Sequence, residues 1–133
     1  MLPSMQLPKR SGHRETRHSI IRTAGGVPFI AASLTHFGIL VDGYRHRKAG
    51  TAESVIGIVL LAGWASTLIR PSLTRRIGLG VQAFALLGTL VGIFTIAIGV
   101  GPRTLPDLVF HACIVIVLLS GLSLAVRAQA NRD

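Results

Sequence analysis

Residues 77–100 read IGLGVQAFALLGTLVGIFTIAIGV and contain no charged side chain. An α-helix rises about 1.5 Å per residue, so a stretch of this length can cross a hydrocarbon core of about 30 Å. Inside lipid, every backbone amide and carbonyl must find its partner within the segment, and this requirement makes such a stretch helical. The sequence therefore predicts a transmembrane helix over residues 77–100.

Three further apolar stretches predict three more spans. They cover about residues 25–44, 51–69 and 105–126, and basic residues or prolines stand at their ends. The connections between the stretches are short, so consecutive helices are expected to be antiparallel neighbours. We therefore predict an all-α fold, a polytopic membrane protein built as an antiparallel bundle of four transmembrane helices.

The composition agrees with a membrane protein and argues against other classes. Half of the residues are hydrophobic, and the mean hydropathy is +0.59. A net charge of +9 could suggest nucleic-acid binding, but the basic residues lie at the ends of the apolar stretches, where lipid headgroups attract them. We therefore expect the lipid bilayer as the partner and no nucleic acid. The sequence also contains none of the common catalytic motifs, so we do not expect an enzyme.

The charged ends of the chain frame the membrane domain. Residues 1–22 are predicted to form a basic, disordered cytoplasmic tail, residues 23–127 the membrane domain, and residues 128–133 a second cytoplasmic tail. With four spans, ten Lys and Arg residues share the side of the two termini, and four lie on the other side. The positive-inside rule then places both termini in the cytoplasm. An Arg-rich leader is also compatible with a mitochondrial presequence, which is the alternative interpretation.

Small residues recur on the predicted helix over residues 77–100. Gly78, Ala85, Gly92 and Gly99 are spaced by seven residues, and Gly88 forms a Gly-x-x-x-Gly pair with Gly92. Helices in lipid associate through close packing of such residues. We expect this face to pack against the other helices, against a larger membrane complex or against a second copy of the chain.

Ionisable residues gather toward one end of the predicted bundle. His36 is expected about 12 Å below the end of the first helix, and His111 about 9 Å below the start of the fourth. The first and fourth helices of a bundle commonly touch, so the two histidines could lie near each other. Asp42, Glu53 and Asp107 lie at the same end of the predicted bundle. An ionisable group within the membrane is costly, so these residues are candidates for a functional site, although capping and snorkelling could also explain them.

Three functions are compatible with this pattern. The first is a non-catalytic accessory or binding subunit that docks through the glycine face. The second is a b-type haem protein in which His36 and His111 are the axial ligands. The third is a small ion or proton transporter, or a metal-binding protein, that uses Asp107, His111 and the neighbouring acids.

A resemblance covers part of the C-terminal half. Residues 86–92 read LLGTLVG, residues 99–104 read GVGPRT, and residues 106–111 read PDLVFH. This pattern resembles one found in uncharacterised small bacterial four-span integral membrane proteins, a group without an assigned activity. The resemblance implies a multi-pass protein of the bacterial inner membrane and draws attention to Asp107 and His111. It implies no reaction.

Overall fold

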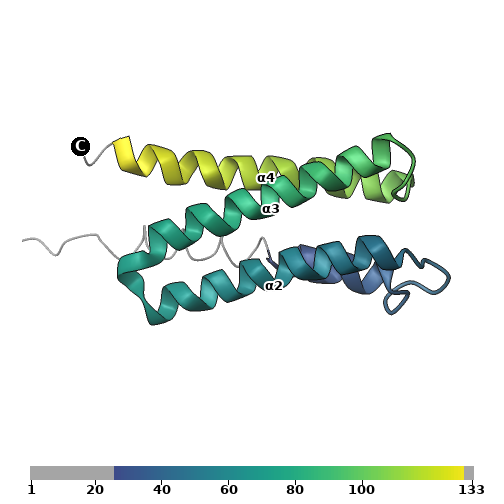
Figure 1. Cartoon of the computed structure of the whole chain (residues 1–133), viewed down its shortest axis with the longest axis horizontal. Coiled ribbons are helices and arrows are strands. Elements are labelled where there is room, and N and C mark those ends of the chain that lie inside the picture. Colours follow the sequence, from purple (N-terminus) through teal and green to yellow (C-terminus); the bar gives the residue numbers. More distant parts are fainter. Residues whose placement is uncertain (1–25, 131–133) are drawn as a thin grey trace, which may run out of the picture.

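The computed structural model describes residues 26–130, and this part of the chain is helical (Figure 1). Three helical segments are long and apolar enough to cross a membrane, as expected for an integral membrane protein: Arg47–Ile69, Pro71–Ala97 and Leu105–Ser123. The predicted basic tail over residues 1–22 lies outside the described residues.

The helices follow one another with short connections. The first helix is described over residues 26–36, and its start lies outside the described part. The others are α2 (Arg47–Ile69), the 3-10 turn η1 (Pro71–Leu73), α3 (Thr74–Ala97) and α4 (Leu105–Ala130). The described part of the first helix rises about 16 Å, which is short of a full span, so a fourth span is not shown. α4 runs beyond the predicted end at residue 126 and includes the start of the predicted C-terminal tail.

The first helix ends at residue 36, and the prediction that it continues to residue 44 is wrong. Gly38 has a φ of 74°, and the N–H of Ile39 donates to the carbonyl oxygen of Leu34 at 2.9 Å. This is the glycine-terminated helix end known as the Schellman motif. The uncharged pattern continues past this glycine, so hydropathy alone does not reveal the end of the helix.

α3 ends in the same way, at Gly99. This glycine has a φ of 83°, and the N–H of Val100 donates to the carbonyl oxygen of Thr95 at 2.9 Å. Arg103 also donates from Nε to the Ile96 carbonyl oxygen at 2.8 Å, which satisfies another carbonyl at the helix terminus. Gly99 lies beyond α3 and is exposed. Its left-handed conformation ends the helix, and among the described residues no neighbouring helix packs on it, so packing against a partner stays a prediction for Gly99.

The other small residues of α3 do pack against neighbouring helices. Gly78 and Ala85 are buried, Ala85 completely. A Cβ added at Gly88 would lie 2.7 Å from Cδ1 of Ile56, a residue of α2. The glycine face predicted on α3 is thus used, in part, inside the chain.

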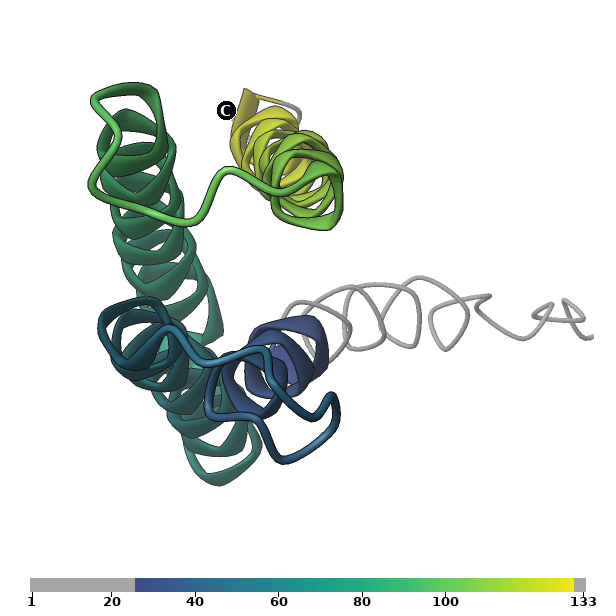
Figure 2. The same ribbon diagram turned by 90° about the vertical axis from the view of Figure 1, so that its right-hand side faces the viewer.

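A second seam of small residues joins the first helix to α2, and the sequence analysis did not identify it. A Cβ at Gly57 would lie 2.7 Å from Cδ1 of Ile30, and one at Gly50 would lie 3.2 Å from Cβ of His36. Viewed along the helices, the first helix lies beside α2, and α4 lies beside α3 (Figure 2). The close approach at Gly50 is what brings His36 against α2.

An apolar core fills the space between the helices. It consists of Phe29, Ile56, Leu60, Ala85, Ile114 and Leu118. The rings of Phe29 and Phe110 meet edge to face, with centroids 5.8 Å apart. The first helix and α4 therefore touch, which confirms the contact expected from the sequence.

Candidate functional site

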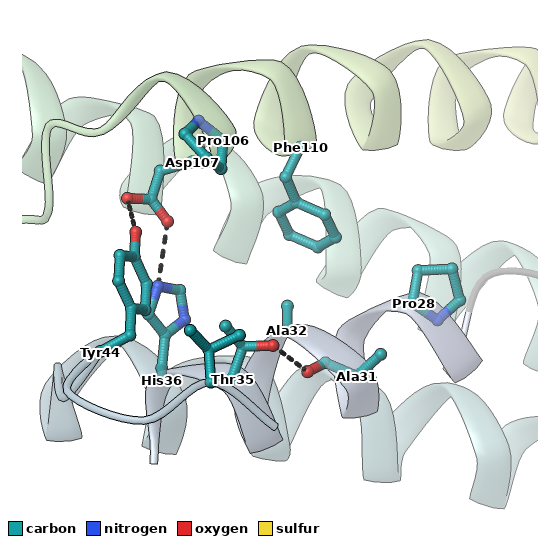
Figure 3. A pocket seen from close by; sticks show the side chains of 10 residues that line it. Pro28, Ala31, Ala32, Thr35, His36, Tyr44, Pro106, Asp107 and Phe110 are labelled. Atoms are coloured by element: carbon teal, nitrogen blue, oxygen red, sulfur yellow. Dashed lines mark hydrogen bonds and ion pairs between the residues drawn. The ribbon is translucent and has the colours of Figure 1, made fainter. Parts of the chain in front are cut away.

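His36 lies at the C-terminal end of the first helix and is 3% exposed. Its Nδ1 is 2.5 Å from Oε2 of Glu53 in α2, and its Nε2 is 3.0 Å from Oδ1 of Asp107 in α4. Both carboxyl groups are buried as well. Three helices thus contribute one side chain each to a hydrogen-bonded group, which we call the Glu53–His36–Asp107 cluster. Figure 3 shows the contact between His36 and Asp107.

Two hydroxyl groups donate hydrogen bonds to the other carboxylate oxygen of Asp107. Thr104 donates to Oδ2 at 2.5 Å, and the hydroxyl of Tyr44 donates to the same oxygen. The Tyr44 ring also stacks on His36, with centroids 5.4 Å apart. Burial, and then the hydrogen bond to Asp107, raises the pKa of Tyr44 above its ordinary value. The phenol therefore remains a protonated donor at neutral pH.

The contacts of His36 fix how many protons the cluster shares. A nitrogen and a carboxyl oxygen at hydrogen-bond distance need one proton between them, so two contacts need two protons. Either an imidazolium lies between two carboxylates, or a neutral imidazole lies between one carboxylic acid and one carboxylate. Both arrangements carry a net charge of −1. They differ only in the position of a proton along one hydrogen bond.

The two carboxyl groups differ in whether all of their oxygens have hydrogen-bond partners. Both oxygens of Asp107 have partners, whereas Oε1 of Glu53 is buried and has no hydrogen-bond partner among the described residues. Leaving a buried polar atom without a partner costs about 1–3 kcal/mol. Glu53 is therefore the member of the cluster that a bound molecule could complete.

His111 lies one turn after Asp107 but outside the cluster. Its Nδ1 donates to the backbone carbonyl oxygen of Asp107 at 2.8 Å, because a carbonyl can only accept. Its ring reaches α3, where a Cβ at Gly92 would lie 2.9 Å from Nε2. This explains why a glycine stands at position 92.

The geometry does not support the predicted haem site. Both ring nitrogens of His36 are held by carboxyl groups, so iron ligation would require one of these hydrogen bonds to break. His111 faces Gly92 rather than the ring of His36. Haem binding through His36 and His111 stays a prediction without support from these contacts.

The predicted metal pair of Asp107 and His111 is also not assembled. The carboxylate of Asp107 is engaged by His36 and by hydroxyl groups, and only its backbone carbonyl contacts His111. Over residues 26–130 there is no group of three or more His, Cys, Asp or Glu side chains arranged to hold a metal ion. Asp42 is exposed in the loop after the first helix and lies outside the cluster.

Two cavities lie next to the cluster. The first, of about 440 Å³, opens between the first helix and α4, as shown in Figure 3. Apolar side chains such as Ala32 and Phe110 form most of its wall, and His36, Tyr44 and Asp107 form one end. This cavity borders the Asp107 side of the cluster.

The second cavity, of about 420 Å³, is lined by residues of α2 and α3, by the loops before α2 and after α3, and by His111 of α4. Glu53 and His111 line it, and so do the basic residues Arg45, Arg47 and Lys48. The Glu53–His36–Asp107 cluster thus extends from one cavity to the other.

The partners of Asp107 were missed in the sequence, although one of them has a recognisable signal. Thr104 and Asp107 have the Thr-x-x-Asp spacing of a capping box at the start of α4, and the Asp107 N–H lies 3.4 Å from the Thr104 hydroxyl. Tyr44 had no such signal, because the fold of the loop over residues 37–46 decides where its ring lies. No protein-family model matches this chain, and neither does a curated protein or a solved structure.

Proposed function

We propose that this protein is a small proton-coupled membrane transporter, in which the Glu53–His36–Asp107 cluster binds and releases a proton as the two cavities exchange their contents. One observation carries the proposal: the buried imidazole of His36 is held at both nitrogens by carboxyl groups from two other helices. An imidazole between two carboxyl groups is suited to accept a proton on one side and pass it on from the other.

Loss of a proton from the cluster would change the contacts between helices. With both protons present, the two contacts of His36 are attractive. When one proton leaves, a nitrogen lone pair faces a carboxylate oxygen, and that contact becomes repulsive in a buried site. The first helix would then separate from α2 at Glu53 or from α4 at Asp107. Protonation is in this way linked to the shape of the cavities.

The apolar core limits how far a proton can move. Phe29, Leu60 and Leu118 form an apolar core beyond the cluster, and Ser33 and Thr89 are the buried polar side chains outside the cluster among the described residues. We therefore propose exchange between the two cavities, coupled to binding of a substrate, rather than an open proton pore.

We further propose a bundle of four spans in the bacterial inner membrane, with the N and C termini in the cytoplasm. The first helix packs on α2 through Gly50 and Gly57, as a membrane helix would. The excess of Lys and Arg in the segments that share a side with the termini supports this orientation. The cluster then lies in the outer half of the membrane.

The role of an accessory or binding subunit stays a prediction. It was motivated by the glycine face of α3, which was expected to dock a partner. In the structure Ile56 packs against Gly88 and His111 packs against Gly92, so the chain's own helices use two of these positions.

Infrared difference spectroscopy of the purified protein in lipid, between low and high pH, tests the proposal. We expect bands of a buried carboxyl group to titrate, and Glu53→Gln or His36→Asn to remove or shift them. Asp42→Asn is the matched control, because Asp42 is an exposed carboxylate outside the cluster. The proposal is wrong if the Glu53→Gln, His36→Asn and Asp42→Asn spectra all titrate like the unaltered protein.

A further inference from the structure

The second cavity has chemical features that the proton cluster does not use. One side of it is formed by the start of α2, where His46 is the N-cap and Arg47 the first helical residue. The N-cap makes no side-chain hydrogen bond within the described residues, and the first turn of α2 contains no acid. The free N–H groups and the dipole of a helix start favour an anion.

Three basic side chains reinforce this preference. Arg45, Arg47 and Lys48 are exposed and line the same cavity. They stand at the beginning of a membrane-spanning helix, where the phosphate groups of lipids lie. The outer part of the cavity is therefore suited to a phosphate group.

The inner part of the cavity presents hydrogen-bond acceptors instead of positive charge. Glu53 is buried, with its side chain 6% exposed, and its Oε1 lacks a partner within residues 26–130. His111 donates from Nδ1 to a backbone carbonyl, so in the neutral ring Nε2 is an acceptor. A molecule with a hydrogen-bond donor could bind here through either acceptor.

We propose that this cavity binds a phosphate ester that also carries a hydroxyl group. The phosphate lies at the start of α2 among the basic side chains, and the hydroxyl donates to Oε1 of Glu53 or to Nε2 of His111. A phospholipid with a glycerol headgroup and a soluble glycerol phosphate share this chemistry. The proposal does not depend on proton transfer, because the cluster uses Oε2 of Glu53 and the ligand uses Oε1.

Thermal unfolding of the full chain in detergent, with added lipid, tests the site. We expect phosphatidylglycerol to raise the Tm more than phosphatidic acid, which lacks the headgroup hydroxyls, and more than phosphatidylcholine. Glycerol 3-phosphate without acyl chains distinguishes the sources. Stabilisation by it as large as that by phosphatidylglycerol would identify a soluble ester as the ligand, and a much smaller effect would identify the lipid.

A double variant distinguishes binding at this site from the general attraction of lipids to basic surfaces. Arg47→Gln with Lys48→Gln should weaken phosphatidylglycerol binding on the order of tenfold, because two cations near the phosphate are lost. Arg75→Gln with Arg76→Gln is the matched control, since these exposed residues lie at the start of α3, far from the cavity in the chain. It should leave binding unchanged.

Two results would overturn the proposal. One is equal stabilisation by phosphatidylglycerol and phosphatidic acid, because the hydroxyl contact would then contribute nothing. The other is an equal loss of binding in the two double variants. Neither result bears on the proton cluster, because none of the four substituted residues belongs to it, and the infrared titration of Glu53 would be unaffected.

Discussion

The phenol ring of Tyr44 stacks on the imidazole of His36, and the Tyr44 hydroxyl donates to Asp107, which holds the same imidazole. The loop over residues 37–46 therefore closes one end of the cluster. The N–H of His46 donates to the carbonyl oxygen of His36 at 2.8 Å and brings the loop back to the start of α2. Tyr44, a residue of this loop, is thus part of the site.

Replacing Tyr44 by Phe should destabilise the protein by about 1–2 kcal/mol at neutral pH, because Asp107 loses a charge-assisted hydrogen bond. Thermal unfolding in detergent measures the loss. Thr104→Val removes the other donor to the same oxygen and should have an effect of similar size. An unchanged Tm in both variants would contradict the described contacts of Asp107.

The raised pKa of Tyr44 predicts a loss of stability in alkaline solution. The folded protein favours the protonated phenol, so its contribution is complete below the unfolded pKa of about 10 and is lost as pH rises through the higher folded pKa. The Tm of the unaltered protein should fall more steeply above about pH 10 than that of Tyr44→Phe. Parallel curves for the two proteins would show that Tyr44 does not contribute to this pH dependence.

Removing the imidazole of His36 should have a larger effect than removing any exposed histidine. His36→Ala leaves two buried carboxyl groups without their shared partner, and breaking a buried ionic contact costs about 3–5 kcal/mol. His46→Ala is the comparison, because His46 is exposed and its ring only meets those of His36 and Tyr44 edge to face, which is worth about 0.5–1.5 kcal/mol. Thermal unfolding of both variants checks the difference, and equal Tm values would contradict the cluster.

Packing at Gly88 predicts a compensating pair of substitutions. Gly88→Ala places a Cβ 2.7 Å from Cδ1 of Ile56 and should cost about 1–3 kcal/mol. Ile56→Val removes that methyl group. The loss of stability in the double variant should therefore be smaller than the sum of the losses in the two single variants. Gly80→Ala is the control, because nothing lies within 4 Å of the added Cβ, and it should be neutral or slightly stabilising.

Gly99 predicts a backbone effect rather than a packing effect. Its φ of 83° disfavours residues with a Cβ, so Gly99→Ala should cost about 1–2 kcal/mol. Gly99→Asn should cost less, because Asn tolerates the left-handed region better. Thermal unfolding of the two variants measures this order. Equal losses would argue for a steric role of Gly99.

The sequence by itself determined the helices that can cross a membrane. Long uncharged stretches over α2, α3 and α4 require helical backbone in lipid, and this depends only on length and composition. It also placed the ionisable residues at one end of the bundle. The ends at Gly38 and Gly99 were missed because hydropathy does not register the left-handed conformation that stops a helix.

Only the tertiary structure decided which polar residues meet. His36 and Asp107 are 71 positions apart in the chain, and their contact depends on how closely the first helix approaches α2 and α4. The sequence paired His36 with His111, since depth in the membrane was the only coordinate it supplied. Rotation of each helix about its axis, set by Gly50, Gly57 and the core, instead turns His36 toward two carboxyl groups and His111 toward Gly92. Depth follows from counting residues, whereas the facing partner follows from packing.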